Sequence, residues 1–473
     1  MAAHTDRAVK TSPSVADRWT RHRSSLLAVA TIAVVAVIAR FAFLDHRSED
    51  YVDFYRRWYQ FIEDNGGYRA LRHQFSNYNV PYLYLLATTV WLKIPSLVAV
   101  KLIPIAFDVL LGWYVYRITR LRYPAGRLPL TAALVVVLLP TVVLNSSMWG
   151  QCDSGYAALA LGGLYHLMRG RSWTACALFG AAFAFKLQAV FLFPVLLLMV
   201  LRRKLPWQCL LAVPGMYLLL DVPALLLGAE PGKLLTVYLD QASLLHGEFI
   251  VTAPNAFQYL DSTPQALQTL GIVLTGVSVL GLVGAAVLRR PDLTHLQLVP
   301  AAAVSALLVP FLLPNMHERY FYLADVLTVI AAFWLPRKLW FAPLLTQFAS
   351  LFAYIPFLLL PYRLRDLTGN PDVVGGSGFA EPAPEAGWLA SAIRLGPSPR
   401  EVLAELFEPV ISYQLLATAV LIALIGTIAV GAGGFGRPPP GPPRPTRGRG
   451  GGENRGPRTT RPGAGGGRRG LKK

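Results

Sequence analysis

Charged and aromatic residues stand between the apolar stretches of this sequence in four short segments, 48–58, 148–153, 185–188 and 314–320. Carboxylates can take up protons there, and ammonium, imidazole and guanidinium groups can stabilise negative charge. Charged groups between hydrophobic segments cost free energy unless they are paired or used, so we treat the four segments as one candidate site. Its members are Asp50, Asp53, Trp58, Trp149, Gln151, Asp153, Lys186, Gln188, His317, Glu318, Arg319 and Tyr320.

Each segment also has an ordinary structural interpretation. Asp50 alone could be a solvated loop acid, and Trp149 could belong to the belt of aromatic residues at a membrane interface. Lys186 could extend its ammonium group to lipid headgroups, and the turn around His317–Arg319 could simply be exposed. We favour a shared site because four separate turns would otherwise all carry such residues without a common reason.

The elements around these segments are predicted to be membrane helices. Hydrophobic residues make up 54% of the chain and charged residues 15%, a balance that a soluble protein of this length could not solvate. Apolar runs such as Leu26–Leu44, Leu270–Leu288 and Leu339–Leu360 are close to the ~20 residues that cross a bilayer. We therefore predict a multi-pass cell-membrane protein.

Basic residues set the predicted sidedness, because cytoplasmic loops are enriched in Lys and Arg. The N-terminal segment 1–24 is basic, and so are the later clusters at 117–127, 169–171, 202–204, 289–290 and 337–338. If all of these are cytoplasmic, the segments between them must form hairpins. Both chain termini are then cytoplasmic, and the candidate site faces the opposite side.

One apolar run must not cross the membrane for this topology to hold. Two runs, Val80–Ile94 and Leu97–Tyr116, lie between the first outer loop and the basic cluster 117–127. Two crossings would leave that cluster outside. We therefore expect Val80–Ile94 to lie in the outer interface, together with the amphipathic stretch Tyr51–Asp64.

The predicted fold is all-α, with about twelve transmembrane helices and two extracytoplasmic interfacial helices in the first outer loop, 45–95. The transmembrane domain covers 25–431, and its larger outer loops are 45–79, 228–265 and 362–408. The expected spans are 25–44, 96–117, 129–145, 153–168, 172–185, 187–201, 207–227, 267–288, 295–313, 320–335, 339–361 and 411–431.

The tail 432–473 supplies +10 of the formal charge of +18 through eleven Lys or Arg and one Glu. Its mixture of Pro, Gly and Arg cannot build a core, so we expect a disordered cytoplasmic tail. Such a tail could bind nucleic acid, but beside a membrane helix we favour contact with anionic lipid headgroups. We expect no nucleic-acid partner.

Other polar residues have structural interpretations. Cys152, Cys176 and Cys209 have a spacing that fits neither a metal site nor a disulfide framework, and we expect no metal and no cofactor. Lys101 and Asp108 lie on one face of a helix, where we expect an ion pair with each other or with other helices. Asp325 could line the site or pair within the bundle.

This layout resembles the GT-C superfamily of glycosyltransferases, which use lipid-phosphate-linked sugars. Members of that superfamily carry an acidic residue in the first outer loop after the first helix, and two interfacial helices before the second. The basic residues require the same arrangement here. The resemblance covers about residues 25–335, and it leaves out the last helix, the loop 362–408 and the tail.

The motifs are most similar to those of dolichyl-phosphate-glucose glucosyltransferases and their bacterial relatives. Gly-Asp-Tyr and His-Trp of that family resemble Glu49-Asp50-Tyr51 and Arg57-Trp58. Its Tyr-Pro-Pro-Leu resembles Asn79-Val80-Pro81-Tyr82, its Phe-Lys-Gln resembles Phe185-Lys186-Leu187-Gln188, and its His-Glu-Lys resembles His317-Glu318-Arg319.

Three departures leave the sugar and the acceptor open. Val80 replaces the first proline of the Pro-Pro pair, and Leu187 is an extra residue within the Lys-Gln motif. The segment Trp149–Asp153 looks more like bacterial membrane mannosyl- or hexosyltransferases.

The resemblance implies an inverting glycosyltransferase that moves a hexose, mannose or glucose, from a polyprenyl-phosphate donor to a glycolipid, glycan or protein acceptor. It implies that Asp50 is the general base, with Asp53 as the second choice. Lys186, His317 and Arg319 would bind the donor phosphate. The sugar or acceptor would be bound by Trp58, Asn79, Tyr82, Trp149, Gln151, Asp153, Gln188, Glu318 and Tyr320.

Two other function classes fit a protein with this many spans. A transporter or lipid flippase should show internal repeats and helices broken near the midplane, and we find no convincing repeat. A lipid-linked glycan polymerase or ligase would use pyrophosphate donors and a large outer loop with several Arg and His. Here the loop 228–265 has only Lys233 and His246.

Overall fold

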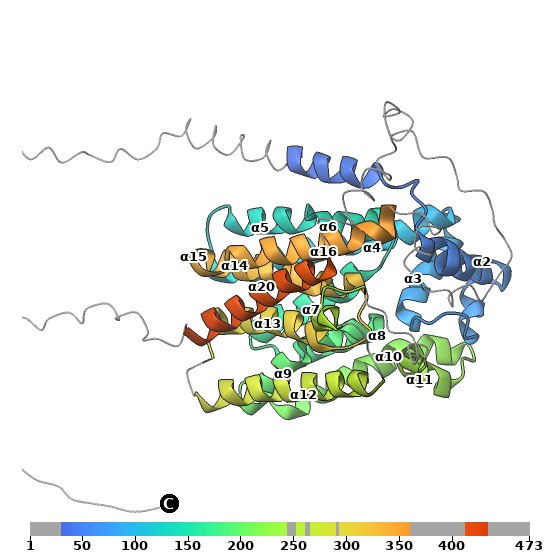
Figure 1. Cartoon of the computed structure of the whole chain (residues 1–473). Coiled ribbons are helices and arrows are strands. Elements are labelled where there is room, and N and C mark those ends of the chain that lie inside the picture. The colour runs from blue at the N-terminus through green and yellow to red at the C-terminus, as the bar shows by residue number, and fades with distance from the viewer. Residues whose placement is uncertain (1–29, 244–251, 261–264, 290–292, 360–411, 434–473) are drawn as a thin grey trace, which may run out of the picture. The chain divides into compact units, whose positions relative to one another are not determined.

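The computed structural model of the chain describes residues 30–243, 252–260, 265–289, 293–359 and 412–433. In these ranges every regular element is a helix (Figure 1), which confirms the all-α prediction. The basic N-terminus 1–24, the outer loop 362–408 and nearly all of the tail lie outside the described residues.

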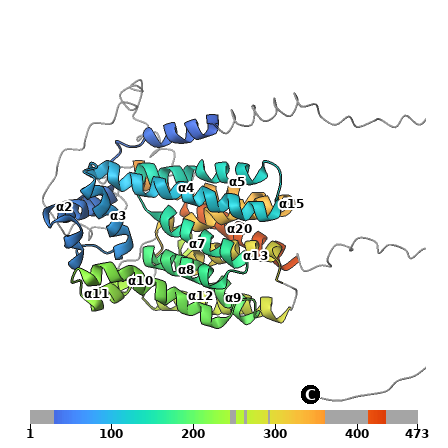
Figure 2. The same cartoon turned by 180° about the vertical axis from the view of Figure 1, so that it is seen from behind.

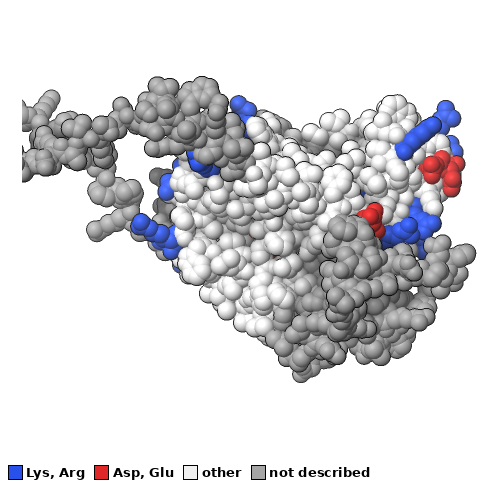
Figure 3. Space-filling model, turned by 90° about the horizontal axis from the view of Figure 1, so that it is seen from above, with Lys and Arg blue, Asp and Glu red and all other residues white. Residues whose placement is uncertain are grey.

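Within the described ranges, six helices are long and apolar enough to cross a membrane. They correspond to six of the expected spans and indicate a membrane-embedded protein. These helices are α4 (Ser96–Arg122), α10 (Ala212–Leu226) with the preceding turn η5 (Trp207–Leu211), α12 (Gln265–Leu288), α13 (His295–Leu312), α16 (Phe341–Leu359) and α20 (Tyr413–Gly433). On the face shown in Figure 3, Lys and Arg side chains lie toward two ends, with an uncharged surface between them.

The span expected at 129–145 is bent in the structure. The structure has α5 (Leu128–Val137), then α6 (Pro140–Val143) continuing into the π-helical η3 (Leu144–Trp149), with a bend of 50° between the two halves. Proline cannot continue a helix but suits its first turn. Pro140 therefore ends one helical axis and starts the next, and η3 carries Trp149 toward the candidate site.

Shorter helices form the interior. The helix α7 (Asp153–Met168) is buried along most of its length and packs against α4 and α8 (Ser172–Phe185), as Figure 2 shows. Glycine permits this close packing, because a Cβ atom on Gly155 would clash with the Phe185 ring. The remaining interior elements are η4 (Leu187–Leu192), α9 (Phe193–Leu201), η7 (Glu318–Phe321) and α14 (Tyr322–Trp334). The short α15 (Pro336–Leu339) buries only Leu339.

The first helix is Ala30–Phe41. The segment that follows it forms helices, as predicted. The π-helical η1 (Tyr51–Tyr55) continues directly into α2 (Arg56–Asp64), and η2 (Gly67–Arg72) leads to α3 (Val80–Trp91). The twelve residues of α3 rise only about 18 Å, which is less than the ~30 Å of a bilayer core. Its position in the membrane interface stays a prediction.

The segment predicted as an outer loop at 228–265 contains helices in the structure. It contains α11 (Pro231–Ser243) and the short η6 (Ala256–Tyr259). Both α11 and the pair α2 and α3 lie at the same end of the helical bundle (Figure 1). That end also contains the first candidate segment.

Buried polar contacts join the first helix to α4. Arg40 pairs with Asp108 at 2.7 Å, and the Ser146 hydroxyl donates to the same carboxylate at 2.7 Å. Lys101 donates to the backbone oxygens of Phe43, Leu44 and His46, at 2.6–2.9 Å, and so caps the end of the first helix. Lys101 and Asp108 therefore pair with another helix and its end, and not with each other.

We expect Arg40→Met to lower the free energy of unfolding by about 3–5 kcal/mol, because it leaves the Asp108 carboxylate buried without its cation. Thermal unfolding in detergent measures the effect. Arg120→Met, on an exposed turn of α4, is the matched control and should unfold like the wild type. Adding Asp108→Leu should recover part of the loss, and a wild-type midpoint for Arg40→Met would contradict the role of the pair.

Candidate functional site

Three of the predicted segments meet at the carboxylate of Asp50, the residue just before η1. Its Oδ2 atom accepts hydrogen bonds from Trp149 Nε1, at 2.7 Å, and from Gln151 Nε2. The Arg319 guanidinium lies 3.8 Å from the same oxygen. The Asp50 side chain is 22% exposed, so a ligand can reach it. Among the described residues, none donates a hydrogen bond to Oδ1 of Asp50.

The Gln151 side chain orients this carboxylate. The hydroxyls of Tyr55 and Tyr78 donate to its Oε1 atom at 3.0 and 3.1 Å, which turns the amide N–H group toward Asp50. Gly150 has φ = +80°, in the left-handed region that favours glycine. This turn lets the Gln151 backbone N–H donate to the Asn145 oxygen at 2.9 Å, which ends η3.

Lys186 and Asp153 form a buried ion pair behind Gln151. Lys186 is in extended backbone (φ −160°, ψ 139°) at the break between α8 and η4, and Asp153 is the first residue of α7. A helix N-terminus favours a carboxylate, and Asn145 also donates to Asp153 at 2.8 Å. A donor phosphate would share Lys186 with Asp153, and the expected contact of Lys186 with the phosphate stays a prediction.

The turn between α13 and α14 supplies the second cation. Glu318 is fully buried, and its oxygens accept from Arg319 at 3.1 Å and from Thr252 at 2.9 Å. Burial raises the pKa of Glu318 above its usual range, although Arg319 opposes this shift. The guanidinium of Arg319 lies over the Trp149 ring, 5.4 Å from its centroid. Its buried Nε–H has no acceptor among the described residues.

The surroundings of His317 disfavour its charged form. Burial and the neighbouring Arg319 lower the pKa of His317 to about 3, so the imidazole is neutral near pH 7. It packs edge-on against Tyr320, with ring centroids 5.2 Å apart. A neutral imidazole can still donate or accept one hydrogen bond. Lys186 and Arg319 are thus balanced by Asp50 and Asp153, with Glu318 as an additional acid.

Several predicted residues support the site without contacting Asp50. The Trp58 and Tyr82 rings pack against Tyr78, with centroids 5.1 and 5.3 Å from it, and so hold the tyrosine that orients Gln151. Asn79 caps α3 by accepting from the Val80 N–H at 2.8 Å. Gln188 is buried in η4.

Two acids belong elsewhere. Asp53 is exposed, and its pKa is raised by partial burial and by Asp50 against the opposing effect of Arg57. Asp325 is buried and accepts from Ser350 at 2.9 Å, which joins α14 to α16. It therefore pairs within the bundle.

Sequence reasoning missed the residues that orient the site from behind. These are Ser48, Tyr55, Tyr78, Asn145, Tyr354 and Phe357. Asn145 gave a usable signal, because an amide inside an apolar helix needs a partner. The two tyrosines gave none, since aromatic residues are common in interfacial segments.

No protein-family model matches the chain, and no curated protein is significantly similar to it. Within the described ranges, no group of three or more His, Cys, Asp or Glu side chains could hold a metal ion. Among the described residues, the chemistry available is that of a carboxylate held through one oxygen, beside a partly buried guanidinium whose Nε–H has no acceptor.

The pH dependence of the stability of the Gln151→Glu variant tests the surroundings of Gln151. Burial and the nearby Asp50 and Asp153 disfavour a charged group here, against the opposing effect of Lys186, whose Nζ lies 3.4 Å from Gln151 Oε1. Since burial is the largest effect, we expect the folded pKa of the introduced carboxyl to rise above its unfolded value of about 4.3. The stability of the variant should approach that of the wild type below about pH 4. It should then fall as pH rises toward the folded pKa, by about 1.4 kcal/mol for each pH unit between the unfolded and the folded pKa.

Thermal unfolding midpoints across this pH range measure the loss. Gln60→Glu on the exposed face of α2 is the matched control and should track the wild type. A pH-independent difference between Gln151→Glu and the wild type would show that the introduced carboxyl does not feel the neighbouring acids.

Proposed function

We propose that the protein is an inverting glycosyltransferase that moves a hexose from a polyprenyl-phosphate donor to a hydroxyl acceptor. The observation that carries this proposal is the carboxylate of Asp50, which is anchored through Oδ2 and is partly exposed, while its Oδ1 accepts no hydrogen bond from the described residues. A positioned carboxylate of this kind can act as a general base for a hydroxyl nucleophile. The order of the four motifs along the chain supports the same chemistry.

In the proposed reaction the acceptor oxygen attacks the anomeric carbon from the face opposite the lipid phosphate. The new carbon–oxygen bond forms as the bond to the phosphate oxygen breaks, and the bonding electrons leave with the polyprenyl phosphate. Asp50 takes the proton of the acceptor hydroxyl and later releases it to water. One displacement without a covalent intermediate inverts the configuration.

Arg319 is the proposed partner of the leaving phosphate. Its buried Nε–H lacks an acceptor among the described residues, and an unsatisfied buried donor is costly until a ligand or water meets it. A guanidinium also suits the planar, paired contact with phosphate oxygens. Lys186 acts by holding Asp153, and His317 offers a neutral N–H.

The basic segments predict that this site faces away from the cytoplasm, with both termini inside. A polyprenyl-phosphate donor then reaches the site within the membrane, and a glycolipid, glycan or protein acceptor reaches it from outside. Mannose and glucose remain equal candidates for the transferred hexose.

We expect Asp50→Asn to lower transfer from polyprenyl-phosphate mannose or glucose by about 10²–10⁴-fold, because the amide cannot take the proton. The rate is measured with the purified full-length protein in detergent and a panel of glycolipid acceptors. Asp64→Asn, an exposed acid at the end of α2, is the control and should keep the wild-type rate. A wild-type rate for Asp50→Asn would exclude Asp50 as the base.

We expect Arg319→Lys to lower kcat/KM for the lipid-phosphate donor by about 10–100-fold, since a point charge cannot replace the paired contacts of a guanidinium. Initial rates against donor concentration measure this loss. Arg69→Lys, at an exposed position of η2, should leave the rate unchanged. Full activity in Arg319→Lys would assign the phosphate to other groups.

A further inference from the structure

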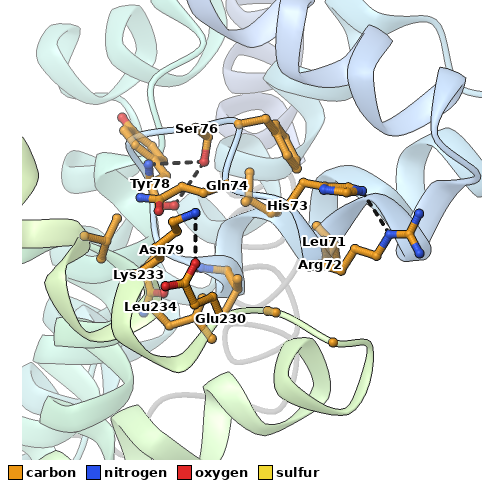
Figure 4. Close-up of a pocket in the computed structure, with 16 residues that line it drawn as sticks. Leu71, Arg72, His73, Gln74, Ser76, Tyr78, Asn79, Glu230, Lys233 and Leu234 are labelled. Atoms are coloured by element: carbon orange, nitrogen blue, oxygen red, sulfur yellow. Dashed lines mark hydrogen bonds and ion pairs between the residues drawn. The ribbon is translucent and has the colours of Figure 1, made fainter.

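A polar cavity of about 590 Å³ lies beside the candidate site, between the segment that joins η2 to α3 and the beginning of α11 (Figure 4). Its wall includes Arg72, Gln74 and Tyr78 from the first side, and Glu230 and Lys233 from the second. Asp50 does not line it. The cavity is therefore a separate space, built mainly by the segment between η2 and α3 and by the beginning of α11.

Several polar groups of this wall contact one another. Arg72 Nε donates to His73 Nε2 at 2.9 Å, and Lys233 pairs with Glu230 at 2.9 Å. The Ser76 hydroxyl donates to the Tyr78 oxygen at 3.0 Å and stabilises the turn between them (Figure 4). Pre-formed concave sites with aromatic walls and a few fixed polar groups are typical of small-ligand recognition.

One wall residue connects the cavity with the candidate general base. The Tyr78 hydroxyl donates to Gln151, whose amide donates to Asp50. Tyr78 also lies against Lys186, whose ammonium nitrogen is 5.6 Å from the centre of the ring. A ligand that packs on Tyr78 from the cavity side thus comes within two hydrogen bonds of the Asp50 carboxylate.

The helix α11 has two faces that differ in character. Glu230, Lys233, Leu234 and Val237 follow helical spacing and line the cavity. Leu235 and Leu239, one turn apart on another face, are 55% and 69% exposed. Leucine side chains exposed on a helix at this end of the bundle suit contact with lipid, so the cavity is positioned for the headgroup of an amphiphile.

We propose that this cavity binds the carbohydrate headgroup of a membrane-anchored acceptor beside the candidate site, with the hydroxyl that reacts reaching Asp50 past Tyr78. This inference rests on the proposed function. Gln74, Asn79 and Arg72 offer planar donors and acceptors for sugar hydroxyls, and Tyr78 and Phe75 offer flat faces for the rings. The lipid part of the acceptor lies along the exposed leucines of α11.

The test measures binding apart from transfer. The full-length protein is placed in phosphatidylcholine nanodiscs and titrated with radiolabelled octyl glucoside and octyl mannoside, well below the concentrations that dissolve the discs. Gln74→Ala and Arg72→Ala should weaken binding at least tenfold. Gln60→Ala, exposed on α2 and outside the cavity, is the matched control and should bind like the wild type.

Three results overturn the inference: no hexoside binding by the wild type, wild-type affinity in both cavity variants, or octyl phosphate competing as well as the hexosides. In the transfer assay, a higher KM for the acceptor in Gln74→Ala at unchanged kcat supports it. Asp50→Asn should keep the wild-type hexoside affinity. If hexoside binding depends on Gln74 but no lipid-phosphate sugar is ever transferred, the carbohydrate site stands and the proposed transferase fails.

Discussion

The buried ion pair between Lys186 and Asp153 is the contact on which the arrangement of the site depends. Each residue lies where a central helix starts or ends, so the pair ties the two helix termini together inside an apolar bundle. Charges buried there are tolerated only when both are present and hydrogen-bonded. Asn145 completes the carboxylate side of the pair, and its backbone oxygen positions Gln151. The orientation of Asp50 then follows through Gln151.

The convergence of distant segments was predictable because its physical cause is visible in the sequence. Apolar runs fix where helices lie, and charged residues at their ends must find partners. The helix over Tyr51–Asp64 was predictable from its amphipathic pattern. The break at Pro140 had a signal too, since proline interrupts a helical span, but the length of the apolar run outweighed it in the prediction.

The pairing and the charge state of individual side chains could not be predicted, because they depend on which groups become neighbours in three dimensions. A lysine in a turn looks available for a phosphate until Asp153 is found against it. The neutral state of His317 follows from its burial and from the neighbouring Arg319. The sequence motif indicates neither how deeply His317 is buried nor how close Arg319 lies to it. The same holds for Arg40 and Lys101, whose partners come from other segments and bind the first helix to α4.

The two π-helical turns, η1 and η3, lie directly at the site, one after Asp50 and one ending at Trp149. A π-turn holds one residue more than an α-helical turn, and such turns are common at functional sites. Deleting that residue would restore an α-helical register and rotate the side chains beyond it by about 100°. Single-residue insertions in two segments are thus a simple route by which an apolar helical bundle could have gained a polar, reactive face.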